Sequence, residues 1–174
     1  MTLSEWLREC ARMTSLWPHQ PVPPTAAQEW YPFLTHLPVE QVRTAIDALM
    51  ADGREFAPTA GLILVKVAEL HEPRLLFGEA YSEIHANIRL YGHDRDPETI
   101  PWSSPLIGEL VRHKSWQYLC LTTDDPSNVE AQCRMLWDAL KRRRIQDRAY
   151  IPLGDAGFVR LLELRQLPPK HDAA

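Results

Sequence analysis

The stretch that decides the fold reads Trp17-Pro18, then Thr25-Ala-Ala-Gln28 before Trp30, then Leu37-Pro38-Val39-Glu40, then Phe56-Ala57-Pro58-Thr59. Each group is typical of a helix end. Thr25 followed three residues later by Gln28 is a capping-box pattern. Pro38 suits the first turn of a helix, where a missing N–H costs nothing, and Pro58 ends one connection before the next helix. These marks predict helices over residues 26–36, 39–51 and 59–71.

Apolar residues recur between these marks in steps of three and four, which is typical of amphipathic helices. The spacing predicts one shared core that includes Trp30, Leu34, Val42, Ile46 and Leu49. A further helix is predicted to open the chain, because Thr2 and Glu5 form a second capping-box pattern. Residues 1–72 are therefore expected to fold as a four-helix domain.

The second half of the chain, after Pro73, also shows apolar residues at helical spacing and residues typical of helix ends. An apolar stripe runs from Phe77 to Tyr91 and is followed by Gly92, a residue typical of a helix C-terminus. A closing helix is predicted after Pro126. We expect an all-α protein of two small helical subdomains, 1–72 and 73–146, with a partly irregular C-terminal tail, 147–174. The tail's apolar segment, 158–164, is compatible with a helix or a hairpin strand.

The composition of the 174 residues is that of a cytosolic globular protein. Hydrophobic residues make up 45% and charged residues 24% of the chain, and no apolar run has the length of a membrane span. The three cysteines are far apart, which argues against a disulfide framework or a zinc site and favours buried thiols. We expect no metal site, no cofactor and no membrane partner.

Charge is distributed unevenly along the chain. Residues 1–72 carry nine acids and five bases, a net charge of −4, whereas the rest of the chain is neutral. The acidic N-terminal domain is therefore a poor candidate for binding a phosphate backbone. A dense basic run ends the closing helix: Lys141, Arg142, Arg143 and Arg144, with Arg148 just beyond. These cations either complement the helix dipole or form a contact for phosphate or an acidic partner.

Catalytic signatures are missing from the sequence. It contains no Gly-x-x-x-x-Gly-Lys-Ser/Thr loop and no Gly-x-Ser-x-Gly motif. The acid pairs Asp94/Asp96 and Asp124/Asp125 stand in turn-forming contexts, where capping explains them. We expect no catalytic residues and no ATP hydrolysis; a nuclease with dispersed acids is the remaining enzymatic alternative.

The first 70 residues resemble the N-terminal domain of the phage replicative-helicase loader/inhibitor family. The resemblance lies in the helix-end patterns from Trp17-Pro18 to Phe56-Ala57-Pro58-Thr59. Residues 77–141 are similar to a downstream module of phage replication proteins, in Phe77-x-Glu-Ala-Tyr81, Trp102-Ser-x-Pro-Leu-Ile107 and the closing helix. The resemblance implies an adaptor without ATPase activity in the cytoplasm of a bacterial host. Its partner would be a hexameric replicative helicase, which it loads onto single-stranded DNA or holds inactive.

The resemblance places the helicase contact in the C-terminal part. The candidate protein-binding residues are Lys141, Arg142, Arg143, Arg144, Phe158, Val159 and Leu162. The apolar ones among them, and Leu161, could instead pack back on the second domain. The candidate nucleic-acid contacts are Lys114, Arg134 and Arg148.

Two other functions remain open, a DNA-binding replication initiator and a phage inhibitor of another host machine such as polymerase. DNA binding becomes credible if the basic run shares one face with Arg134 and Lys114. An origin-binding protein is a second candidate partner.

Overall fold

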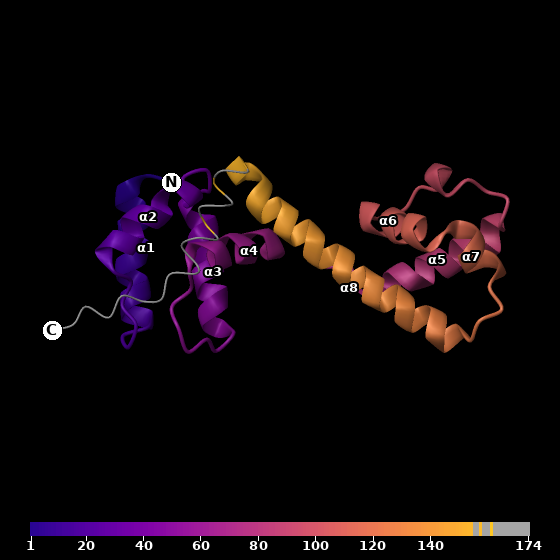
Figure 1. The fold of residues 1–174 in the computed structure, drawn as a ribbon, viewed down its shortest axis with the longest axis horizontal. Helices are drawn as coiled ribbons and strands as arrows, with labels where there is room; N and C mark the ends of the chain where they lie inside the picture. The colour runs from indigo at the N-terminus through magenta and orange to yellow at the C-terminus, as the bar shows by residue number, and fades with distance from the viewer. Residues whose placement is uncertain (155–156, 158–160, 162–174) are drawn as a thin grey trace. The chain divides into compact units, whose positions relative to one another are not determined.

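The computed structural model describes residues 1–154, 157 and 161, and in this part of the chain every regular element is a helix. Eight α-helices and two short 3-10 helices are present, with no strand among the described residues (Figure 1). The all-α fold class is thus confirmed. No helix in the described ranges has the length and apolar character needed to cross a lipid bilayer.

The chain divides into two compact units. Unit 1 combines Met1–Glu72 with the described residues from Ile145 onward, and unit 2 is Pro73–Arg144. Unit 1 contains α1 (Leu3–Leu16), α2 (Pro24–Leu34), α3 (Val39–Ala51) and α4 (Ala60–Leu70). These four helices pack against one another (Figure 1).

The helix starts in unit 1 follow the sequence marks in all but one case. Thr2 caps α1 in the predicted capping box, with the Thr2 amide donating to Glu5 Oε2 at 2.6 Å. Pro38 and Thr59 are the N-cap residues of α3 and α4. The exception is α2, which begins at Pro24, two residues before the predicted start.

The predicted capping box of Thr25 and Gln28 is not formed, because Thr25 lies inside the first turn of α2. Pro23 is the N-cap residue, in an extended conformation, and Pro24 occupies the first helical position. A proline there has its φ angle already set for the helix and lacks only an N–H that would be unpaired. The proline pair therefore starts the helix earlier than the threonine would.

The core of unit 1 is built around two tryptophans of the first 17 residues. Trp6 is fully buried and its Nε1 donates to the carbonyl of Ala27 at 2.6 Å, which ties α1 to α2. Trp17 is 4% exposed and donates to the carbonyl of Arg54 at 2.9 Å. Leu34, Val42, Ile46 and Leu49 are buried in the same cluster. Trp30, predicted to share that core, is only partly buried and packs against its edge.

Unit 2 contains α5 (Phe77–Tyr91), α6 (Pro105–Lys114), α7 (Trp116–Leu121) and the first part of α8 (Pro126–Tyr150), with a 3-10 turn at Pro97–Thr99. Gly92 ends α5 at a φ of 67°, a left-handed conformation that favours glycine. The buried faces of these helices form a second apolar cluster, which includes Phe77, Ile84, Ile107, Leu110, Trp116 and Trp137.

Helix α8 differs most from the prediction. It continues past residue 146 to Tyr150 and is followed by a 3-10 turn at Ile151–Leu153. Its last residues belong to unit 1, where Ala149 is 3% exposed and Ile145 packs against the core. The helix continues because lysine, arginine and glutamine are good helix formers. Residues 145–154 are thus part of the first unit's fold rather than an irregular tail.

Candidate protein-binding site

The basic run lies on α8 without forming a single cationic face. Arg142 and Arg143 are exposed, whereas Lys141 and Arg144 are half-buried. Consecutive residues of an α-helix are about 100° apart around its axis, so four in a row spread around the helix. The Arg142 guanidinium also donates to the carbonyl of Asp138 one turn earlier at 3.2 Å. Arg142 and Arg143 are the solvent-exposed cations of this run.

The two candidate nucleic-acid contacts of unit 2 lie on different sides of α8. Lys114 donates to the side chain of Gln132 at 2.6 Å. Arg134 pairs with Glu130 at 3.0 Å and lies 4.7 Å above the ring of Phe77. Gln132 and Arg134 are two positions apart, about 200° around the helix. The one-face arrangement that would favour DNA binding is therefore not formed.

Arg148 binds within unit 1. Its Nη1 lies 3.2 Å from the Glu72 carboxylate and donates to the carbonyl of His71 at 2.9 Å. The Glu72 side chain is only 5% exposed, and His71 is the C-cap residue of α4. A cation at a helix C-terminus is electrostatically favourable. The sequence suggested a nucleic-acid contact for Arg148, but the structure gives it a role in joining α8 to α4.

Unit 1 carries an open groove between α2, α4 and the end of α8. The groove has a volume of about 410 Å³, and its apolar lining consists of Trp30, Ala57, Ala60, Leu62, Val65, Tyr150 and Leu161. Arg54, Thr59 and Gln146 supply polar atoms at its walls. Apolar walls with a few polar groups are typical of sites that bind another molecule.

Leu161 is the described residue of the C-terminal segment that reaches this groove. It is 7% exposed and belongs to the core cluster of unit 1. The sequence allowed it to pack back on the second domain, and the structure packs it on the first. Phe158, Val159 and Leu162, the apolar candidates for partner binding, lie outside the described residues.

Leu161 packs against the backbone at Gly61, and this contact position is the seat of Leu161. A Cβ atom at Gly61 would lie 3.4 Å from Leu161 Cδ2 and 3.7 Å from its Cγ. The isolated glycine near the start of α4 is the sequence signal that could have indicated this close approach. Sequence reasoning used α4 only for its apolar stripe and missed the groove.

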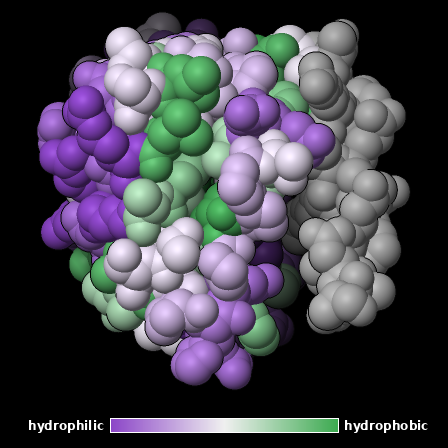
Figure 2. Space-filling view, turned by 90° about the vertical axis from the view of Figure 1, so that its left-hand side faces the viewer, coloured by the Kyte–Doolittle hydropathy of each residue, from purple (hydrophilic) through white to green (hydrophobic). Residues whose placement is uncertain are grey.

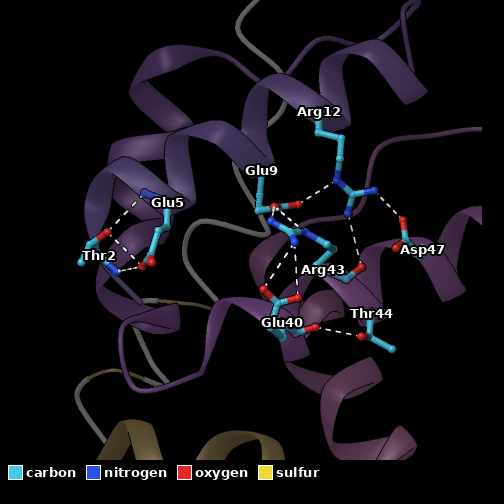
Figure 3. Close-up of polar contacts among 8 residues, drawn as sticks. All are labelled: Thr2, Glu5, Glu9, Arg12, Glu40, Arg43, Thr44 and Asp47. Carbon is cyan, nitrogen blue, oxygen red and sulfur yellow. Dashed lines mark hydrogen bonds and ion pairs between the residues drawn. The ribbon is translucent and has the colours of Figure 1, made fainter.

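A buried carboxylate that the sequence analysis did not single out, Glu9, links α1 to α3 in unit 1 (Figure 3). The Glu9 side chain, 3% exposed, accepts from Arg12 Nε at 2.8 Å, and from Arg43 Nη2 at 2.8 Å and Nε at 3.0 Å. Arg12 also pairs with Asp47, and Arg43 with Glu40. The hydrogen bond with Glu9 raises the pKa of Arg43. This network of two arginines and three carboxylates joins α1 to α3.

A second cavity lies in unit 2, and a charged pair lies on its rim. Unit 2 has an open cavity of about 540 Å³ beside Trp102, where Arg112 and Glu98 pair on the rim. In the described part of the chain, no group of three or more His, Cys, Asp or Glu side chains could hold a metal ion.

Figure 2 shows the face that carries the N-terminal helices, with apolar side chains in an interrupted band between hydrophilic ones. On α1 the exposed apolar residues are Leu3 and Leu7, each 41% exposed.

The structure therefore places Leu161 at a groove of unit 1, and Arg142 and Arg143 are exposed on α8. Apolar anchor sites and exposed cations are both features of surfaces that bind proteins. In comparisons with family models, curated proteins and solved structures, no significant match to this chain was found.

Proposed function

We propose that this chain is an adaptor of phage or prophage DNA replication. It binds a hexameric replicative helicase in the cytoplasm of a bacterial host and loads or inhibits it, without ATPase activity of its own. The observation that carries the proposal is the pattern of helix ends in residues 1–72, which resembles the helicase loader/inhibitor family. Two marks of that pattern, Pro38 and Thr59, are N-cap residues of consecutive helices.

The basic run and the C-terminal segment would supply different parts of the helicase contact. Exposed cations such as Arg142 and Arg143 speed encounter with an acidic partner surface and make it sensitive to salt. Apolar anchors slow dissociation, because a few buried side chains usually dominate affinity. The candidates for these anchors are Phe158, Val159 and Leu162.

Surface plasmon resonance with a purified hexameric replicative helicase tests the proposal, at a low and a physiological salt concentration. The double variant Arg142→Glu/Arg143→Glu should associate about tenfold more slowly, with a weaker salt dependence. The matched control is Arg74→Glu/Arg89→Glu, which reverses two exposed arginines elsewhere in unit 2. It changes the net charge equally and should leave the association rate unchanged.

Removal of residues 155–174 tests the apolar part of the contact and should raise the dissociation rate. A deletion that starts after Gly154 keeps Ala149 in the core of unit 1 but removes Leu161 from it, so circular dichroism must show that the shortened chain is folded. Absence of helicase binding by the intact chain would refute the adaptor proposal. Strong binding of a labelled single-stranded oligonucleotide instead would favour a replication initiator, and recovery of polymerase from host lysate would favour an inhibitor of another machine.

A further inference from the structure

The groove of unit 1 is formed to receive a leucine side chain. Gly61 is the second residue of α4, and a Cβ atom added there would already be in van der Waals contact with the Leu161 side chain. Leu161 lies eleven positions beyond the end of α8 and is still only 7% exposed. Any side chain larger than alanine at position 61 would compete with Leu161 for this space.

Leu161 does not fill the groove. A volume of about 410 Å³ stays open beside it, lined by Trp30, Leu62, Val65 and Tyr150. This volume is in the range of sites that bind small molecules or side chains of a partner, about 300 to 1,000 Å³. Leu161 is therefore a buried side chain at the wall of a larger apolar site that is still open.

An anchor of this kind is reversible. Burial of one leucine side chain favours the docked state over the free state by a factor of about ten to a hundred. The short connection from Tyr150 keeps the leucine near its seat, which gives the intramolecular contact a high effective concentration. Leu161 is thus expected to occupy the groove most of the time and to leave it in a minor population.

We propose that the groove between α2, α4 and the end of α8 is the docking site of this chain's own C-terminal segment, and that docking through Leu161 competes with binding of the segment to the helicase. This second part rests on the proposed function. The candidate anchors Phe158, Val159 and Leu162 flank the docked leucine in sequence. A partner that binds only the released segment has its apparent affinity lowered by the released fraction.

The first experiment measures docking without any partner. Gly61→Leu places a side chain in the seat of Leu161, and Leu161→Asp removes the apolar anchor. The matched control is Gly78→Leu, because Gly78 is also the second residue of its helix, α5. Apart from its chain neighbours and the backbone of its own helix, no described atom lies within 4 Å of its Cβ position. Limited trypsin digestion of the full chain then reports cleavage after Arg160 and Arg165.

Cleavage after Arg160 should be about tenfold faster or more in Gly61→Leu and in Leu161→Asp than in the wild type, and unchanged in Gly78→Leu. Circular dichroism of each variant checks that it is folded, and Leu161→Asp serves if Gly61→Leu is not. Equal cleavage rates in the wild type and Leu161→Asp would overturn the docking site. A mass that doubles with concentration in light scattering, and is lost in Leu161→Asp, would assign the seat to a second copy and overturn docking within one chain.

The second experiment measures competition. Gly61→Leu should bind the helicase about tenfold more tightly than Gly78→Leu, because its C-terminal segment is always released. Faster Arg160 cleavage with unchanged helicase affinity would refute competition and leave the docking site established. Faster cleavage with no helicase binding by any variant would refute the proposed function alone.

Discussion

At the scale of single residues, the tryptophans of unit 1 differ in burial, and this sets the cost of removing them. Trp6 is fully buried and bonded to the Ala27 carbonyl, whereas Trp30 lines the open groove. Trp6→Ala should lower the free energy of unfolding by about 3–5 kcal/mol, the usual cost of a buried aromatic residue. Trp30→Ala should cost less, about 2 kcal/mol, because part of its surface is already in water. Urea denaturation of the two variants compares them directly, and an equal loss would contradict the edge position of Trp30.

The three cysteines also differ in burial, and this determines how fast each thiol reacts. Burial, followed by the nearby Glu9 carboxylate, raises the pKa of Cys10 to about 12, and burial also raises the pKa of Cys133. Cys120 is only half-buried. Because the thiolate is the reactive form, a disulfide reagent at pH 8 should modify Cys120 first. Cys10 and Cys133 should react only after denaturant is added, and rapid reaction of all three in the native protein would contradict their burial.

The Cys10 shift also links stability to pH. Because its folded pKa is above the unfolded value, the folded chain holds this proton at a pH where the unfolded chain has lost it. The stabilisation is complete below pH about 9.0, the pKa of the thiol in the unfolded chain, and decreases as the pH rises toward about 12. Cys10→Ala should reduce this alkaline loss, which thermal denaturation between neutral and alkaline pH can measure.

At the scale of elements, α8 is held to unit 1 by Arg148 as well as by its apolar side chains. Arg148→Met should lower stability by about 1–3 kcal/mol, because the buried Glu72 carboxylate and the His71 carbonyl lose a charged donor. Arg148→Lys keeps the charge and should recover part of the loss. Thermal denaturation measures both, and the exposed Arg142→Met is a control that should change little. Equal melting of all variants would show that the pair contributes nothing.

At the scale of the whole molecule, unit 1 is made from both ends of the described chain. Trypsin should cut first after Arg74, which is exposed and outside any helix, rather than after Arg148, which lies in α8. The two products should stay together in native gel filtration, because Ala149 and Leu161 are in the core of residues 1–72. Elution as separate fragments without denaturant would contradict this construction.

The sequence by itself determined the local structure. Periodicity and end marks located α3 at its observed bounds, Val39–Ala51, and placed α5 up to the glycine at 92. These signals work because helix formation depends on neighbours within one or two turns. Where two local signals competed, as at Pro24 and Thr25, the sequence reading chose the wrong start. The sequence showed the dense cations at 141–148, but it did not show which groups they bind within the fold.

The tertiary structure alone decided which core each apolar stripe joins. Ile145, Ala149 and Leu161 pack in unit 1, although at least 70 residues separate them from α1–α4 in sequence. They are apolar, like the residues that form the core of unit 2. No local pattern therefore predicts which of the two cores they join. The same holds for Glu9 with Arg43, and for Gly61 with Leu161, since each partner is chosen by packing across the chain. Burial of apolar surface is non-directional, so the contact that forms depends on the shapes that the folded helices present to each other.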